Sequence, residues 1–232
     1  MIEATRARIA GHWSRRFGAP VPGPFPITVG ATGRYADGAL VVVLDGRAHV
    51  DAPLDHLDAV VALTEGRDPT DLLDPAFWTP LASAPVLGPA DRYWADHSWT
   101  DHAAALGDPA PEIPLERLAE LRPLVTEREW LEAGFASNPI LAHGFEHDGR
   151  LVAAAVLTAL WGWPADVGVL VAPDARGEGL GSRVAVSALT AAVSVAGFGC
   201  YRVERGNAAS VAVARHLRLE PYGANVLVPL AP

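Results

Sequence analysis

The segment from residue 167 to residue 182 constrains the fold of this chain more than any other, and it reads Val-Gly-Val-Leu-Val-Ala-Pro-Asp-Ala-Arg-Gly-Glu-Gly-Leu-Gly-Ser. Its apolar start has the length and β-branched content of a buried strand. Gly177, Gly179 and Gly181 follow, and then an apolar pattern that predicts a long helix. Because glycine has no side chain, an anion could approach the backbone N–H groups at the start of that helix, where the helix dipole is positive. The segment therefore favours binding of a phosphate or pyrophosphate.

The spacing of the glycines selects among the known phosphate-binding patterns. The dinucleotide fingerprint Gly-x-Gly-x-x-Gly needs its third glycine one residue later, and no Lys-Ser/Thr pair completes a P-loop. Val171, Pro173, Arg176, Gly179 and Gly181 instead occupy every position of a strand ending Val-x-Pro followed by Arg/Gln-x-x-Gly-x-Gly/Ala. In this the chain resembles the acyl-coenzyme A (CoA) signature of the GNAT N-acetyltransferase superfamily.

The order of predicted elements from residue 115 onward resembles the same family. Hydrophobic periodicity and turn signals predict, in order, two helices, three strands, a helix, a strand, a helix and a final strand. The helices lie at 115–121, from 126, at 179–196 and at 207–217, and Thr126-Glu-Arg-Glu129 is typical of a capping box at the start of the second. The strands lie at 141–147, 151–160, 167–171, 198–203 and 225–230. The resemblance implies an α/β (α+β) fold of the GNAT acyl-CoA N-acyltransferase type, with a mixed central sheet flanked by helices.

The first part of the chain predicts a smaller α/β element. Residues 3–17 have the spacing of an amphipathic helix, the Asp45-Gly46 turn between apolar runs predicts a hairpin over residues 39–50, and a helix follows to Thr64. Residues 66–90 are rich in Asp, Pro and Gly, so we divide the chain into residues 1–82 and a GNAT domain of residues 83–232. The element of residues 1–82 would cover the side of the active site where the acceptor binds. A second hypothesis makes it a degenerate acetyltransferase-like half, although it has no second Arg-x-x-Gly-x-Gly.

The resemblance also implies which residues bind the cosubstrate, acetyl-CoA or CoA. Val169 and Val171 would offer backbone groups to the pantetheine arm, and Arg176 would assist at the phosphates unless it is an ordinary solvated arginine. The pyrophosphate would lie against the amides of Gly177, Gly179, Leu180, Gly181 and Ser182. The sequence Asn207-Ala-Ala-Ser210 resembles the family's Asn-x-x-Ala/Ser helix. Asn207 would bind the pantetheine or acceptor, or would only cap a helix, and Ser210 would reach a phosphate.

Catalysis is less well specified by the sequence. Acetyl transfer from a thioester needs a neutral amine, a site for charge on the carbonyl oxygen and a proton for the leaving thiolate. The family often has a carboxylate base at the start of the motif strand, and the nearest acid is Asp166, which could equally cap a turn. The position of the family's usual general acid, a tyrosine, is Ala214. Without that tyrosine there are three alternatives. A water or Tyr222 would protonate the thiolate, the thiolate would leave without a general acid, or the domain would bind CoA without turnover.

Other candidate sites are weaker. His143 and His147 lie in one predicted hairpin, but hairpin histidines are usually only solvated or locally hydrogen-bonded, so we expect no metal. Trp161 and Trp163 could line an acceptor pocket, although packing is the commoner role of such aromatic residues. Cys200 lies in the middle of a predicted strand, which favours a buried inert thiol. No Gly-x-Ser-x-Gly is present to indicate a hydrolase.

Composition limits the partners of the 232-residue chain. A net charge of −9 without a basic face disfavours nucleic acid as a binding partner. No apolar stretch is as long as the roughly 20 residues that a membrane-spanning helix needs. A single cysteine is typical of a reducing cytoplasm. Together with the resemblance, this implies a cytoplasmic N-acetyltransferase that transfers acetyl to an amine of an unidentified acceptor. A small-molecule amine is expected, an antibiotic, an amino acid and a protein terminus stay open, and a CoA-binding regulatory or structural module is the alternative function.

Overall fold

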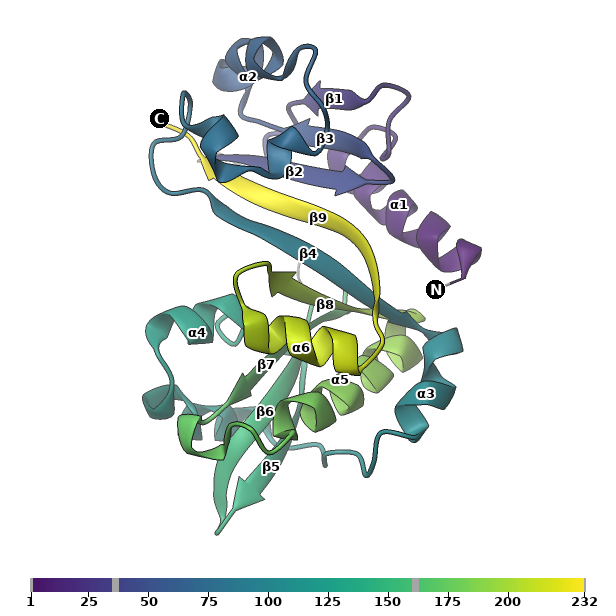
Figure 1. The fold of residues 1–232 in the computed structure, drawn as a ribbon, viewed down its shortest axis with the longest axis vertical. Helices are drawn as coiled ribbons and strands as arrows, with labels where there is room; N and C mark the ends of the chain where they lie inside the picture. Colours follow the sequence, from purple (N-terminus) through teal and green to yellow (C-terminus); the bar gives the residue numbers. More distant parts are fainter. Residues whose placement is uncertain (1, 35–37, 160–162, 232) are drawn as a thin grey trace. The chain divides into compact units, whose positions relative to one another are not determined.

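The structure is a computed structural model that describes residues 2–34, 38–159 and 163–231, and the chain forms two compact units (Figure 1). The unit named here the α1 unit comprises Arg6–Arg92, Val203–Asn207 and Pro221–Pro232. The α5 unit comprises Met1–Thr5, Tyr93–Arg202 and Ala208–Glu220. Neither unit is one continuous segment. The predicted division into residues 1–82 and 83–232 stays a prediction.

The α1 unit contains a sheet in which strands from both ends of the chain are neighbours. Its elements are helix α1 (Glu3–Phe17), strands β1 (Ile27–Gly30), β2 (Gly38–Leu44) and β3 (Arg47–Asp51), helix α2 (Leu57–Thr64) and strand β9 (Glu220–Pro229). The strand order is β1-β3-β2-β9, with β1 parallel to β3 and the other pairs antiparallel. Asp45 and Gly46 both have positive φ, 50° and 70°, as the predicted two-residue hairpin turn requires.

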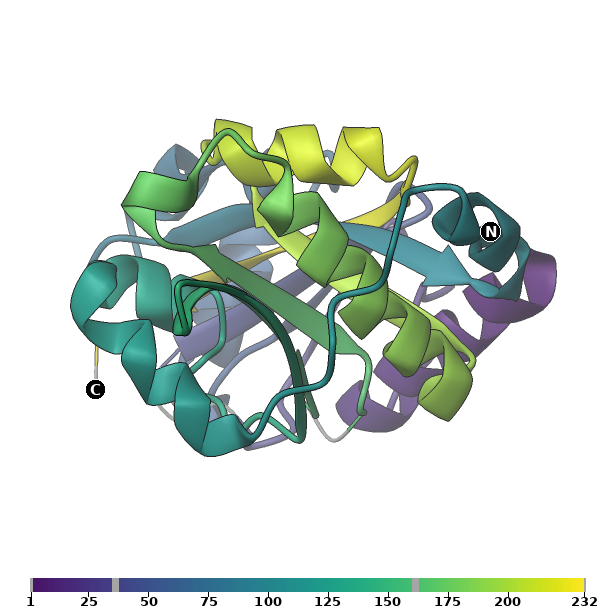
Figure 2. The same ribbon diagram turned by 90° about the horizontal axis from the view of Figure 1, so that it is seen from below.

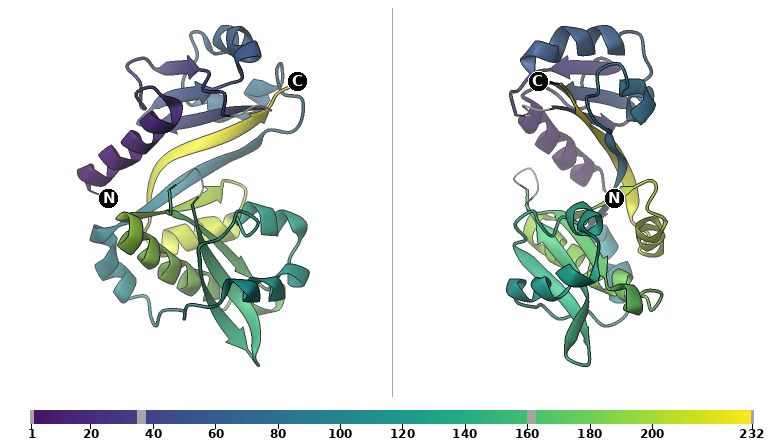
Figure 3. Two further views of the ribbon diagram at one scale, coloured as in Figure 1. Left: turned by 180° about the vertical axis from the view of Figure 1, so that it is seen from behind. Right: turned by 90° about the vertical axis from the view of Figure 1, so that its left-hand side faces the viewer.

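The two faces of this sheet are covered by different helices, as Figure 3 shows. Val41 and Val43 of β2 belong to an apolar core with Val60 of α2 and Trp78. On the other face the ring of His49 stacks on Phe17 of α1, with ring centroids 4.3 Å apart. Desolvation lowers the pKa of His49 to about 4, so this buried imidazole is neutral at pH 7.

The α5 unit has a mixed sheet, which confirms the predicted fold class. Its strands are β5 (Leu141–His147), β6 (Arg150–Thr158), β7 (Asp166–Val171) and β8 (Phe198–Glu204), together with the end of β4 (Leu87–Asp96). The order β8-β7-β6-β5 places β7 parallel to β8, and the other two pairs are antiparallel. The helices are α3 (Thr100–Ala104), α4 (Glu127–Glu132), α5 (Leu180–Ala196) and α6 (Ala208–His216).

Helix α5 is the longest element of this unit and packs against β5, β6 and β7 (Figure 2). It begins and ends where the sequence predicts, because Gly179 and Gly197 cap it with φ of 79° and 82°, in the left-handed region. Its buried side consists of apolar and small side chains such as Val184, Leu189 and Val193. The glycine-rich turn is thereby fixed at the carboxyl end of β7.

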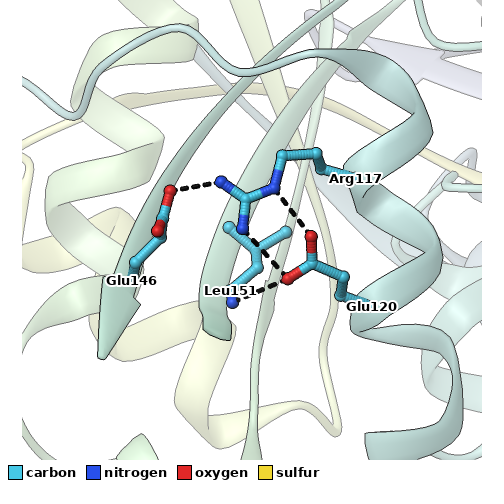
Figure 4. A network of polar contacts seen from close by, with 4 residues as sticks. All are labelled: Arg117, Glu120, Glu146 and Leu151. Atoms are coloured by element: carbon cyan, nitrogen blue, oxygen red, sulfur yellow. Dashed lines mark hydrogen bonds and ion pairs between the residues drawn. The ribbon is translucent and has the colours of Figure 1, made fainter. Parts of the chain in front are cut away.

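The segment before α4 is helical, as predicted. Residues Leu115–Glu120 form a 3-10 helix, η5. A polar network attaches η5 to the sheet (Figure 4): the guanidinium of Arg117 donates to Glu120 over 2.7 and 3.0 Å and also contacts Glu146 of β5. Glu120 in turn accepts the N–H of Leu151 at 3.0 Å. The network joins η5 to both strands of the β5–β6 hairpin.

Differences from the prediction concern short elements. β1 lies in the proline-rich stretch between the predicted helix and hairpin, where no strand was predicted, and its pairing with β3 stabilises it. Helix α3 was not predicted, and β9 begins five residues before the predicted strand at Asn225. No helix among the described residues is both long and apolar enough to cross a bilayer.

Candidate functional site

Strands β7 and β8 are paired over only part of their length. Their two pairs are Asp166 with Cys200 and Val167 with Tyr201. β7 continues to Val171 beyond these pairs. Among the described residues, the edge of β7 from Gly168 to Val171 therefore has no β8 partner.

The backbone groups on this open edge come from alternate residues of β7. The N–H of Ala172 donates to the carbonyl of Val152 at 2.7 Å, so Ala172 directs its backbone groups toward β6. In an antiparallel pair the direction alternates from residue to residue. Val169 and Val171, the two residues predicted to offer backbone groups, thus direct them away from β6, toward the open edge.

The glycine turn lies directly after this edge. Gly177 and Gly179 have φ of 87° and 79°, whereas a Cβ on either would meet nothing within 4 Å. Their requirement for glycine is therefore conformational. The N–H groups of Ser182 and Arg183 both donate to the carbonyl of Gly179, at 3.1 and 3.3 Å. The Ser182 amide, one of those predicted to bind phosphate, is thus already engaged within the first turn of α5.

Three elements converge at Gly181. A Cβ built there would lie 3.4 Å from Val171, 3.8 Å from Val169 and 3.8 Å from Val213 of α6. The start of α5 is therefore in contact with the side chains of the β7 residues that border the open edge and with one face of α6. The structure brings together five of the predicted cofactor residues here: Val169, Val171, Gly179, Leu180 and Gly181.

The side chain of Arg176 is held by neighbouring groups. Its Nε donates to the carbonyl of Val171 at 3.1 Å, and its Nη2 donates to Glu129 at 2.7 Å. Glu129 also accepts the N–H and hydroxyl of Thr126, completing the predicted capping box of α4. These hydrogen bonds, led by the backbone N–H of Thr126, hold the pKa of Glu129 below its usual value. The sequence indicated the cap, but it gave no signal of the bond to Arg176.

Gly168 is a site residue that the sequence did not indicate. A Cβ at this position would lie 1.7 Å from the carbonyl oxygen of Ala133, the residue after α4. Since residues two apart share a face of a strand, Asp166 lies on the same face of β7 as Gly168. Asp166, the predicted base, is the first residue of β7 and pairs with Thr158.

The remaining predicted residues lie around α6. Asn207 belongs to the α1 unit, and its N–H donates to the carbonyl of Glu204 at 2.9 Å. Ser210 forms a side-chain hydrogen bond with Tyr201 of β8. Ala214 is fully buried in α6. The hydrogen bond between Ser210 and Tyr201 was not predicted, because it joins two elements through side chains.

The weaker candidates have ordinary structural environments. His143 Nδ1 lies 3.0 Å from the carbonyl oxygen of Ala110. His143 and His147 are four residues apart on a strand, about 13 Å, which is too far to share a metal ion. Trp163 packs edge-on against Phe198, and Cys200 is buried. Trp161 lies outside the described residues. Within 2–34, 38–159 and 163–231, no group of three or more His, Cys, Asp or Glu could hold a metal ion.

Comparisons with solved structures found proteins described as GNAT acetyltransferases, at low similarity to this chain. A GNAT-family protein of Novosphingobium aromaticivorans is 19% identical with a TM-score of 0.48, covering 63% of this chain and 66% of its own. A GNAT-family acetyltransferase of Colwellia psychrerythraea is 16% identical with a TM-score of 0.49, covering 84% and 65%. A GCN5-related N-acetyltransferase-like protein of Streptococcus suis is 15% identical with a TM-score of 0.44, covering 82% and 83%. The chain spans less than two thirds of the first two proteins.

The family itself is shown by the sequence. No curated protein matches the chain. The family model described as Acetyltransferase (GNAT) family matches residues 95–217, which is more than half of the chain. The matched region includes β7, the glycine turn, α5 and α6. The chain therefore belongs to the GNAT acetyltransferase family.

Proposed function

We propose that the protein transfers an acetyl group from acetyl-CoA to the amine of a small-molecule acceptor, by direct attack in a ternary complex. The observation that carries this proposal is the edge of β7 from Gly168 to Val171, which has no β8 partner and runs directly into the glycine turn of α5. Family membership supports acyl-CoA as the donor.

The arrangement suits a long ligand with an amide-rich arm and a charged end. The outward backbone groups of Val169 and Val171 would pair with the pantetheine amides much as an added strand would. The carbonyl of Val171 already accepts from Arg176, so we assign the first contact to Val169. The N–H groups at the start of α5 that precede Ser182 would bind the pyrophosphate, because the first N–H groups of a helix have no intrahelical acceptor and the helix dipole is positive there.

Acetyl transfer needs the amine and the thioester held in line, which this binding mode would supply. The amine nitrogen attacks the carbonyl carbon, and the N–H of Val169 would stabilise the charge that develops on the oxygen. Asp166, at the other end of β7, is our candidate for the base that keeps the amine neutral.

Binding of CoA without turnover is the second candidate function. The observation that favours it is the buried methyl side chain of Ala214, which has no proton to donate where the family usually has a tyrosine. In that case the β7 edge and the glycine turn would still bind the cosubstrate. A measurement of turnover separates the two functions.

The proposed function is tested by incubating the protein with acetyl-CoA and a panel of primary amines while free thiol release is followed. The site variant is Gly179→Glu, which adds a carboxylate and a strained backbone at the phosphate position. Its matched control is Gly149→Glu, in the β5–β6 turn, because Gly149 also has positive φ, 77°, and a Cβ there would meet nothing within 4 Å. We expect similar losses of thermal stability for both variants, with loss of acetyl-CoA binding for Gly179→Glu only.

Thiol release that depends on one amine and disappears in Gly179→Glu would support the transferase and identify its acceptor class. A rise in melting temperature with acetyl-CoA but no release with any amine would support the CoA-binding module. If acetyl-CoA raises the melting temperature of neither the original protein nor Gly149→Glu, the proposal is wrong.

A further inference from the structure

Tyr201 is the last residue of β8 that pairs with β7, and the open edge of β7 begins just beyond this pair. It pairs with Val167. Residues paired across two strands have side chains on the same face, and residues two apart on one strand share a face. Tyr201 therefore lies on the face of Val167, Val169 and Val171, which is the face in contact with Gly181 at the start of α5.

The hydroxyl of Tyr201 is placed by α6. It forms a hydrogen bond with Ser210, and the next turn of α6 brings Val213 to Gly181. Because residues three apart on a helix are neighbours, Ser210 and Val213 lie on one side of α6. The phenol thus lies on the side of α6 that meets the glycine turn and Val169.

On this basis we propose that Tyr201 is the general acid that protonates the leaving thiolate, with Ser210 as its positioning residue. The inference rests on the proposed acetyl transfer and deepens it. It also accounts for Ala214, since a phenol supplied by β8 makes a second donor on α6 unnecessary.

The amine nitrogen forms a bond to the carbonyl carbon, and the carbon–sulfur bond breaks with its electron pair remaining on sulfur. The Tyr201 hydroxyl gives its proton to that sulfur, which leaves as the thiol. The nitrogen loses one proton to the base, and one proton from solvent restores the phenol through Ser210, so no net proton is consumed.

The protonation state of Tyr201 is compatible with this role. Burial raises the pKa of the phenol, and the hydrogen bond with Ser210 only partly offsets that effect. Because the raised pKa lies well above neutral pH, the phenol carries its proton at pH 7 and has it available to donate.

The experiment compares two leaving groups in Tyr201→Phe, which removes only the hydroxyl. Hydroxylamine serves as the acceptor probe, since it is a small nucleophile that does not require a fitted acceptor pocket. With acetyl-CoA we expect kcat to fall about 100-fold, the lower range for loss of a general acid. With the selenoester analogue of acetyl-CoA we expect a much smaller loss, because a selenolate is a weaker base and needs less protonation. Ser210→Ala should show the same pattern with a smaller effect.

Tyr93→Phe, in β4 of the same unit, is the matched control and should leave kcat unchanged. Acetyl-CoA binding, followed by the rise in melting temperature, should be the same for Tyr201→Phe and the original protein. Lost binding, an unchanged kcat, or an equal loss with both esters would each overturn the role of Tyr201 and leave the transferase standing. No acceleration by the original protein, with hydroxylamine or any amine of the panel, would overturn both proposals.

Discussion

The glycines of the motif region differ in why they are glycine. Gly177 and Gly179 are required by their positive φ, whereas a Cβ at Gly181 would only make ordinary van der Waals contact, the nearest with Val171 at 3.4 Å. Gly168 is required because the carbonyl of Ala133 occupies the space of a side chain. The sequence predicted the turn and its place, since glycine spacing is a local signal. It could not indicate Gly168, whose partner comes from α4 and becomes a neighbour only through folding.

Replacing Gly168 with alanine should therefore destabilise the protein. The added Cβ would lie 1.7 Å from a backbone oxygen, so α4 or β7 must shift, at a cost of about 1–3 kcal/mol. Chemical denaturation measures this difference. Gly206→Ala is the control, because a Cβ there meets nothing within 4 Å, and we expect it to be neutral or slightly stabilising. A Gly168→Ala protein as stable as the control would contradict the close approach of α4 to β7.

At the level of elements, the sequence predicts those whose signals are local. Helix α5 has an apolar stripe and glycine caps, and the β2–β3 hairpin has its Asp-Gly turn, so both were predicted within a residue or two of their bounds. β1 could not be predicted in this way, and for the predicted helix at 115–121 the local pattern did not indicate the 3-10 form. β1 is stabilised by pairing with β3, and η5 by the charged network to the β5–β6 hairpin, both of which are tertiary contacts.

The network at η5 should make stability depend on acid. Hydrogen bonds from Arg117, followed by the N–H of Leu151, lower the pKa of Glu120 from 4.5 to about 2. Because the folded-state pKa is the lower one, the stabilisation is fully present above pH 4.5 and is lost as pH falls from 4.5 toward 2. Thermal melts across this range measure it. In Glu120→Gln we expect a shallower dependence, and an unchanged slope would show that the network does not stabilise η5.

At the level of the whole molecule, the two units draw on separated parts of the chain. β9, near the end of the chain, pairs with β2, near its beginning, within the α1 unit. Pairing between strands far apart in the chain cannot be read from composition. The predicted boundary between residues 82 and 83 rests on a loop-rich stretch, so it carries no information about which strands pair. The role of residues 1–82 also stays a prediction. The hypothesis that they form a degenerate acetyltransferase half is tested by finding where along the chain the cosubstrate binds.

Hydrogen–deuterium exchange with and without acetyl-CoA tests that question most directly, because a bound backbone N–H exchanges more slowly. We expect slower exchange in peptides covering residues 167–182, which contain the open edge of β7 and the glycine turn, and no change over residues 27–51. Slower exchange confined to residues 27–51, or no change anywhere in the chain at saturating acetyl-CoA, would contradict the site proposed here.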